Sequence, residues 1–177
     1  MDIFIEKLVA RKKTAQDVAF AIGAIVFTIL VILTLFPFVL YLPFLAVRMV
    51  GSLAMVGLVY LCYWTISKRT IEFEYSLTNN ELDIETIIAR RKRKKLITVD
   101  IKRIDILAPV SSEKYRRERN SQTVTQTYDC SSGANNDETY FTVFIDQSGR
   151  KCLLLFEPNE KMIAGFARYN PNKVFRA

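Results

Sequence analysis

The amino-acid sequence predicts a membrane α-helical hairpin followed by a mainly-β domain that ends in a helix. The first observation is the stretch 18–66, in which Arg48 is the only charged residue. Because one bilayer crossing takes about 20 apolar residues, this stretch is long enough for two helices and a turn. The second is a change at Thr70, after which apolar and polar residues alternate as in a β-strand. The third is an apolar pattern of helical spacing in 158–169.

Residues 1–16 are predicted to form a short amphipathic helix at the membrane surface. Their apolar residues recur at helical spacing, and charged residues occupy the other faces. The apolar set is Met1, Phe4, Ile5, Leu8 and Val9. Because so short a helix is marginal in water, a frayed polar leader is the alternative. The segment TAQD, Thr14–Asp17, resembles the capping box that starts a helix.

The two membrane spans are predicted at 17–37 and 44–66. Pro37 and Pro43 bracket the segment PFVLYLP. Proline inside a helix removes a hydrogen bond and clashes with the preceding turn, so the break between the spans is expected here.

Three side chains are predicted to anchor the second span at the membrane interfaces. Arg48 falls about one turn into this span, where its long stem can carry the guanidinium out to the headgroups. A transport or gating charge is the alternative interpretation of Arg48. At the opposite end of the span, Tyr63 and Trp64 fit the aromatic belt of a membrane–water interface.

The distribution of Lys and Arg predicts a cell-membrane protein with both termini in the cytoplasm. Cations lie just before the first span and just after the second, whereas the connecting turn between the spans has only Arg48. The flanking cations are Lys7, Arg11, Lys12, Lys13, Lys68 and Arg69. Such an excess marks the cytoplasmic side. A cleaved signal peptide is excluded because the first apolar stretch exceeds a signal core and a second span follows at once.

The cytoplasmic domain predicted for 70–177 consists of six or seven antiparallel strands and one helix. The strand segments are TIEFEYSL, ELDIETIIA, LITVDI, RIDILA, TYFTVFID and KCLLLFE. Residues 111–138 are polar and are predicted to be largely a loop, with one edge strand around TQTYDCS. The last element is the helix PNEKMIAGFARY, for which Pro158 is a favoured first-turn residue. Its apolar residues are Met162, Ile163, Phe166 and Tyr169.

This order of elements resembles the pleckstrin-homology-like (PH-like) fold, an antiparallel roll of seven short strands closed by a C-terminal helix. The segments YSLTNNELDI at 75–84, RRKRKK at 90–95 and LITVDIKRIDIL at 96–107 are similar to those of bacterial PH-like membrane proteins. The whole chain also resembles an uncharacterised family of small two-span membrane proteins of Gram-positive anaerobes. It departs from that family where Thr98 stands in place of a proline and in its long polar insertion.

The six consecutive cations of the basic run supply almost all of the net charge of +7, because without them 19 Lys+Arg remain against 18 Asp+Glu. The basic run is Arg90, Arg91, Lys92, Arg93, Lys94 and Lys95. We interpret it as a turn between two strands that contacts anionic membrane lipids, where each cation is worth about 1 kcal/mol. A solvated turn that serves solubility is the alternative. Nucleic acid is excluded as a partner, since no aromatic or Gly-rich platform is interleaved with the cations.

The resemblance argues against a specific inositol-phosphate pocket. In lipid-binding eukaryotic members of the fold, basic residues at the first strand turn hold the phosphoinositide. That turn is interpreted here as LTNNEL, which has no cation and includes Glu81. Summed charge, rather than a shaped pocket, is therefore the predicted basis of lipid contact.

The sequence predicts no enzymatic activity, no cofactor and no metal site. It contains no histidine, so histidine-dependent triads and imidazole ligands are excluded. Cys62, Cys130 and Cys152 have neither metal-like spacing nor an obvious base nearby. The segment YDCSSG groups Asp129 and Cys130 with a serine, but neighbouring residues of a strand point to opposite faces.

Two classes of function remain. The first is a non-enzymatic, membrane-anchored interaction module that docks on anionic lipid headgroups or on another membrane protein. The second is an accessory subunit of a transporter or another integral membrane complex, or a homo-oligomer, in which the helices pack against other helices. Ala19 and Gly23 have the small-x-x-x-small spacing that lets helices approach closely.

Overall fold

The computed structural model describes residues 4–133, 138–146 and 148–176. The chain forms two compact units, one of residues 13–70 and one built from residues up to Lys12 together with those from Ile71 onward. The second unit is thus assembled from both sides of the first. Each unit is described by itself.

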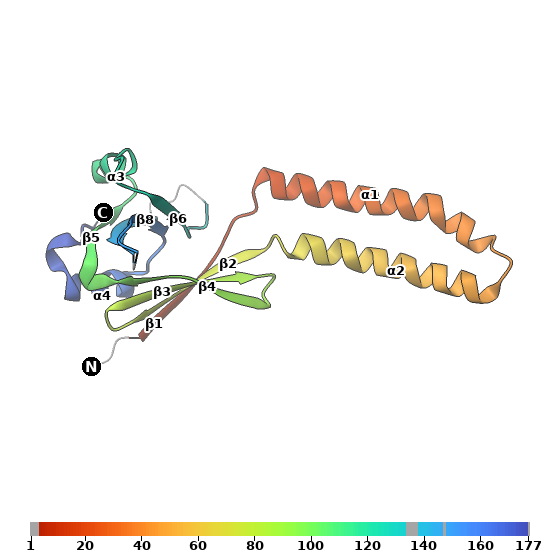
Figure 1. Ribbon diagram of the computed structural model, residues 1–177, viewed down its shortest axis with the longest axis horizontal. Coiled ribbons are helices and arrows are strands. Elements are labelled where there is room, and N and C mark those ends of the chain that lie inside the picture. The colour runs from red at the N-terminus through yellow and green to blue at the C-terminus, as the bar shows by residue number, and fades with distance from the viewer. Residues whose placement is uncertain (1–3, 134–137, 147, 177) are drawn as a thin grey trace. The chain divides into compact units, whose positions relative to one another are not determined.

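The helical unit consists of α1 (Ala15–Leu40) and α2 (Leu45–Ser67), which run side by side as an antiparallel pair (Figure 1). Both helices are long and apolar enough to cross a membrane. Thr14 caps α1, with its hydroxyl accepting from the Asp17 amide and the Asp17 carboxylate accepting from the Thr14 amide. The predicted capping box is confirmed.

The predicted break at Pro37 is wrong by three residues, because α1 continues to Leu40 with Pro37 inside it. In the last turn of a helix the missing proline N–H forfeits one hydrogen bond, and no further turns follow to be disrupted. Between the two helices, Gly51 allows close contact. A Cβ on this glycine would lie 2.7 Å from Val39 Cγ1.

The start of α1 and the end of α2 are joined by one ionic cluster. Arg69 Nη1 lies 3.0 Å from Asp17 Oδ1, which links the start of α1 to the residues after α2. The guanidinium carbon of Arg69 also lies 3.8 Å from the centre of the Phe20 ring. Cation–π contacts and ion pairs at exposed sites each contribute at most about 1 kcal/mol. This cluster therefore adds little stability, and its main effect is to hold the start of α1 beside the residues that follow α2.

The N-terminal segment is a strand, so the predicted amphipathic helix in 1–16 is wrong for its described part. Strand β1 (Phe4–Ala10) pairs antiparallel with β2 (Ile71–Thr78), from Phe4 opposite Thr78 to Ala10 opposite Glu72. Met1 lies outside the described residues. The pairing continues past the strand, where the Arg11 amide donates to the Ile71 carbonyl at 3.0 Å. The helical hairpin is therefore inserted between two hydrogen-bonded neighbours of one sheet.

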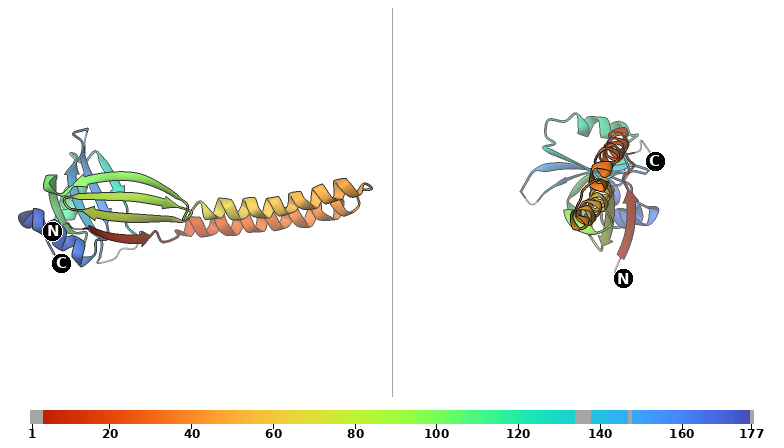
Figure 2. Two further views of the ribbon diagram at one scale, coloured as in Figure 1. Left: turned by 90° about the horizontal axis from the view of Figure 1, so that it is seen from below. Right: turned by 90° about the vertical axis from the view of Figure 1, so that its right-hand side faces the viewer.

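The β-domain contains two four-stranded sheets, ordered β1-β2-β3-β4 and β5-β7-β8-β6 (Figure 2). The further strands are β3 (Glu81–Ile88), β4 (Lys92–Asp100), β5 (Ile104–Pro109), β6 (Gln126–Asp129), β7 (Tyr140–Ile145) and β8 (Lys151–Phe156). A 3-10 turn, η1 (Ile101–Arg103), connects β4 to β5. All six strand segments expected from alternation are confirmed, and the described arrangement agrees with a PH-like roll.

The core lies between the two sheets and is closed by α4 (Glu160–Tyr169). Tyr75, Phe156 and Phe166 are fully buried in it; the rings of Tyr75 and Phe156 meet edge to face, and those of Phe156 and Phe166 meet at a tilt. Gly165 lets the helix approach the first sheet, because a Cβ there would lie 2.8 Å from Leu77 Cδ2. The apolar face predicted for this helix is confirmed: Met162, Ile163 and Phe166 are buried.

The start of α4 differs from the prediction. The N-cap of the helix is Asn159, whose side-chain oxygen accepts from the Met162 amide at 2.8 Å. Pro158 therefore precedes the cap and lies outside the helix. The chain ends in a second 3-10 turn, η2 (Pro171–Lys173), after which the Phe175 amide donates to the Leu107 carbonyl of β5.

The polar stretch 111–138 contains more structure than the predicted loop. Helix α3 (Glu113–Arg119) covers the outer face of the second sheet, where Tyr115 meets the Phe141 ring. The predicted edge strand is confirmed as β6, which pairs in parallel with β8. Residues 134–137 lie outside the described residues.

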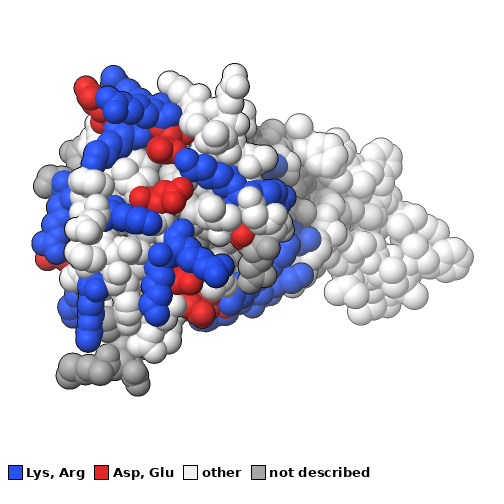
Figure 3. All heavy atoms as spheres, turned by 60° about the vertical axis from the view of Figure 1, so that its left-hand side comes forward, with Lys and Arg blue, Asp and Glu red and all other residues white. Residues whose placement is uncertain are grey.

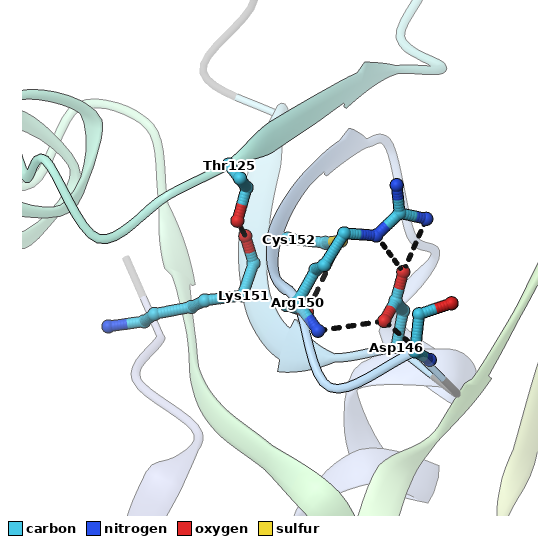
Figure 4. A network of polar contacts seen from close by, with 6 residues as sticks. Thr125, Asp146, Arg150, Lys151 and Cys152 are labelled. Atoms are coloured by element: carbon cyan, nitrogen blue, oxygen red, sulfur yellow. Dashed lines mark hydrogen bonds and ion pairs between the residues drawn. The ribbon is translucent and has the colours of Figure 1, made fainter.

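A polar network closes the β7–β8 hairpin (Figure 4). Asp146 accepts from the Ser148 and Arg150 amides, and its carboxylate pairs with the Arg150 guanidinium at 2.8 Å. These bonds, chiefly the Arg150 amide, lower the pKa of Asp146. Thr125 joins β6 to this hairpin through the Lys151 carbonyl. Every group in the network serves the turn, so it is a structural feature of the hairpin.

Candidate functional site: the basic β3–β4 hairpin

The basic run forms the tip of the β3–β4 hairpin and the first half of β4, rather than a turn alone. Ala89, Arg90 and Arg91 make the turn, and the remaining four cations begin β4. All six side chains are exposed. The prediction of a single cationic turn is therefore wrong for Lys92 to Lys95, whose side chains alternate between the two faces of the sheet.

The turn itself holds two non-glycine residues in a left-handed conformation. Ala89 has φ 54° and Arg90 has φ 56°, and the Arg91 amide donates to the Ile88 carbonyl. Two consecutive positive φ values are the pattern of a type I′ hairpin turn, which strongly favours Asn-Gly. An alanine and an arginine here cost about 1–2 kcal/mol each. The sequence therefore keeps a cation at a position where backbone conformation favours glycine.

Half of the basic run is neutralised by carboxylates on the outer face of the first sheet. Arg90 Nε lies 2.9 Å from Glu72 Oε1. Arg93 Nη1 lies 2.8 Å from Glu74 Oε2, which has no other polar partner among the described residues. Lys95 Nζ lies 2.9 Å from Asp83 Oδ1, and this hydrogen bond raises the pKa of Lys95.

The register explains which cations are paired. Arg93 lies opposite Ile87 and Lys95 opposite Glu85, and these positions share the outer face with Glu74. Lys92 and Lys94 lie opposite Ile88 and Thr86, on the face that carries the core further along the strands. Arg91, Lys92 and Lys94 make no ion pair within the described part of the chain.

The basic run lies at the end of the sheet where the chain leaves for the helical hairpin. Ile71 lies opposite Ile88, and Ile88 lies opposite Lys92. On the other side, Ile71 accepts from the Arg11 amide. One row across the sheet therefore runs from Arg11, the last residue before α1 that is hydrogen-bonded to β2, through the first residue of β2 to the basic run.

This arrangement overturns the predicted numbering of the turns. LTNNEL joins β2 to β3 and is the second strand connection, because β1 precedes the helices. The first connection is the helical hairpin itself, and it begins with Arg11, Lys12 and Lys13. The argument that the first turn lacks cations is therefore wrong.

The predicted interface anchors lie on α2. Arg48 is in the first turn of this helix and is half-buried. Tyr63 and Trp64 lie in its last two turns with exposed rings, and Lys68 Nζ lies 3.2 Å from the centre of the Trp64 ring. This placement agrees with the predicted sequence positions, and an interfacial role remains a prediction.

The cysteine of the YDCSSG segment is fully buried, and burial raises the pKa of the Cys130 thiol to about 12. Its neighbour Asp129 accepts from the Ser131 amide and hydroxyl. A neutral, enclosed thiol is a poor nucleophile. No group of three or more potential metal ligands occurs among the residues that the structure describes.

One family profile matches the chain, from residue 1 to residue 176, and its description is Bacterial PH-like domain (DUF6106). The chain belongs to this family. No curated protein and no solved structure matches it. The family description gives this protein a PH-like fold, in agreement with the two sheets and the closing helix. PH-like domains are generally non-catalytic, and the family description includes no ligand.

Sequence reasoning missed the partners of the basic run. Glu72, Glu74 and Asp83 fall on the polar positions of two alternating strands, which was the available signal. Arg11 was counted only as a topology cation. The ion pairs of the three carboxylates with the run, and the place of Arg11 in the same row of the sheet, depend on the register of β1 to β4, which no single segment contains.

Proposed function

We propose that this PH-like protein is a non-enzymatic, membrane-anchored module whose domain contacts anionic lipid headgroups through the basic run. The observation that carries this proposal is the position of three unpaired cations, Arg91, Lys92 and Lys94, at the sheet end that continues into the apolar helices. A domain tethered at that end has its basic run within a short reach of the bilayer. The strained cationic turn supports the same conclusion, because strain is retained where it serves a function.

The pairing of β1 with β2 supports a hairpin that crosses the membrane twice. Two strands that hydrogen-bond must lie in the same compartment, so the segments before α1 and after α2 emerge on one side. Cations flank these segments, and the positive-inside rule assigns that side to the cytoplasm. Both termini are therefore cytoplasmic, and the residues 41–44 face outward. Arg48 anchors the outer end of α2, while Tyr63 and Trp64 anchor its cytoplasmic end.

The expected strength follows from the count of unpaired cations. Each cation near an anionic leaflet contributes about 1 kcal/mol, so three contribute roughly 3 kcal/mol, whereas six would contribute about twice as much. The contact acts within a Debye length of the surface, about 8 Å at physiological salt. Cations held by Glu72, Glu74 and Asp83 add less, because their field is already compensated nearby.

The test measures how close the hairpin tip comes to the headgroups in the full-length protein. The chain, with Cys62→Ser, carries a fluorophore at Ala89→Cys and is reconstituted into nanodiscs that contain a headgroup-labelled quencher lipid. Quenching is expected to be stronger with phosphatidylglycerol than with phosphatidylcholine alone, and to weaken as salt rises. A fluorophore at Glu81→Cys, at the other end of β3, is the matched control and should respond to neither change.

Variants of the basic run separate the alternatives. Replacing Arg91, Lys92 and Lys94 with glutamine should abolish the lipid-dependent quenching, while an all-lysine run should retain it. If the glutamine variant is quenched like the native chain, the run is a solvated hairpin. If the all-lysine variant loses the effect while its β-structure survives, the ligand requires arginine geometry and the summed-charge proposal is wrong.

An accessory role in an integral membrane complex is the second candidate. A Cβ on Gly23 or Gly57 would meet no atom within 4 Å, so both small residues face open space on their helices. Such faces suit close packing against another helix. Gly23→Leu with Gly57→Leu should then prevent co-purification with an integral partner, and unchanged co-purification would contradict this candidate.

A further inference from the structure

A second cationic surface lies at the end of the domain farthest along β4 from the basic run. Strand β4 begins at Lys92 and ends at Asp100, so its two ends are roughly 26 Å apart at about 3.3 Å per residue. At the far end, four elements contribute exposed or half-exposed cations. We call this set the distal basic surface: Lys102, Arg103, Lys114, Arg117, Arg168 and Lys173.

Direct contacts join these elements into one continuous surface. Lys102 of η1 lies 5.8 Å from the Tyr169 ring at the end of α4, and Asn170 donates to the Ile101 carbonyl. Lys173 of η2 donates to the Ile104 carbonyl at 2.7 Å. Lys114 of α3 lies 2.7 Å from the centre of the Phe175 ring. The C-terminal segment therefore holds η1, α4 and α3 together along the edge of β5.

The charge of this surface is predominantly positive and largely uncompensated. Arg103 makes one ion pair among the described residues, a loose one with Asp100 at 3.9 Å. Arg117 and Arg168 make no ion pair with any described residue. Figure 3 faces this end of the domain and shows Lys and Arg spread over much of its surface, with fewer Asp and Glu between them.

We infer that the distal basic surface binds an acidic segment of another protein. Its distance along β4 from the basic run is about three Debye lengths, so the two basic surfaces attract their ligands independently. The aromatic rings on it are already covered by lysine side chains, so they offer no platform on which nucleobases stack. Exposed carboxylates, Asp105 and Glu113, lie among the cations. These repel a uniformly charged phosphate backbone but fit a peptide in which acidic and neutral residues alternate.

The test uses the full-length protein in nanodiscs of phosphatidylcholine, where the membrane offers no net negative charge. The probe is a short fluorescein-labelled peptide of alternating glutamate and serine, and binding is followed by fluorescence anisotropy. Binding is expected at low salt and should weaken steadily as salt rises. Combined Arg103→Gln, Arg117→Gln and Arg168→Gln should weaken it by at least about tenfold.

The matched control removes three cations from elsewhere, through Lys7→Gln, Lys13→Gln and Arg150→Gln, and should change the affinity by less than about twofold. Equal losses in the two variants would show that net charge alone attracts the peptide and would overturn the inference. Failure of the native chain to bind the peptide would also overturn it. So would tighter binding of a DNA duplex that the first variant abolishes, because the surface would then recognise nucleic acid. None of these three results depends on contact between the basic run and lipid.

Discussion

Excision of the helical hairpin should convert this protein into a soluble β-domain, provided that β1 is kept. Two chains test this expectation. The joined chain replaces residues 12–70 with Asn-Gly, so that Arg11 and Ile71 flank a two-residue turn. The truncated chain begins at Ile71 and lacks β1. Asn-Gly suits the type I′ turn that such a hairpin requires, and the Arg11 amide already donates to the Ile71 carbonyl.

The stability difference between the two chains can be worked from the burial of β1. Val9 is 6 % exposed, and Ile5 packs at the edge of the same core. Burial of one such side chain is worth about 1.5–3 kcal/mol. Each hydrogen bond of the β1–β2 ladder adds about 1 kcal/mol net. Ordering the backbone of the strand costs about 1–2 kcal/mol per residue and offsets much of this gain.

The seven residues of β1 gain about as much from the ladder hydrogen bonds as they lose in backbone entropy, so the burial of Val9 and Ile5 decides the difference. The truncated chain should therefore be less stable than the joined chain by about 3 kcal/mol, a large part of the 5–15 kcal/mol typical of a domain. Urea unfolding followed by circular dichroism measures the difference directly. The joined chain should unfold in one cooperative transition, and the truncated chain should be partly unfolded or aggregated without urea. Val9→Asp in the joined chain is the matched control, and it should reproduce most of the loss because it buries an unpaired charge.

Two outcomes would refute this reasoning. If the truncated chain is as stable as the joined chain, β1 is not an integral strand of the domain. If the joined chain fails to fold while the full-length protein folds in detergent, the helices supply stability that the sheet register does not account for.

The remaining predictions concern single positions. Ala89→Gly should raise stability by about 1 kcal/mol in urea unfolding, because it relieves a left-handed alanine at φ 54°, and a loss would contradict the turn geometry. Phe166→Ala should cost about 3–5 kcal/mol, since this ring is fully buried under α4, and a change near zero would mean that the helix is peripheral. The pKa of Asp146 is lowered in the folded state, so its stabilisation is present above about pH 4 and is lost as the pH falls through the folded value. Asp146→Asn should make the free energy of unfolding less dependent on pH in the acid range, and an unchanged pH dependence would count against the hairpin network. A membrane-impermeant maleimide should label Tyr41→Cys in intact cells, whereas Ser111→Cys should need permeabilised cells, and the reverse pattern would refute the topology.

Local patterns predicted most of the strands and the closing helix, because the spacing of their buried residues is visible within each short segment. Each of the strands β2 to β5 alternates or is apolar throughout, and α4 places Met162, Ile163 and Phe166 on one stripe. The two long apolar helices were equally evident from length and composition. The end of α1 was missed because proline is costly in the middle of a helix but inexpensive in its last turn.

The N-terminal strand was missed because its partner lies more than 60 residues away in the sequence. The segment FIEKLVA has apolar residues at helical spacing, and it also places Ile5 and Val9 on one face of a strand. Periodicity alone cannot separate these two interpretations in seven residues. The edge of β2 that lacks a partner is what selects the strand over the helix, and this edge exists only once the rest of the sheet has formed.

The candidate site was half predictable. The basic run and its place between two strands were evident from the sequence, but its division into paired and unpaired cations was not. That division depends on strand alternation from Lys92 onward and on the outward-facing carboxylates of β2 and β3. A charge count of six therefore overstated the charge available to a ligand by a factor of about two.

The insertion of the helices between β1 and β2 has a consequence for biosynthesis. The ribosome completes β1 before either helix, yet this strand has no partner until both helices and β2 have been made. Under the proposed two-span topology, failure of one helix to enter the bilayer would leave β1 and β2 on opposite sides, and the sheet could not close. The finished domain would then carry an open edge and an exposed core, which are the features that quality-control proteases recognise. Under that topology, closure of this sheet would report that membrane insertion has been completed correctly.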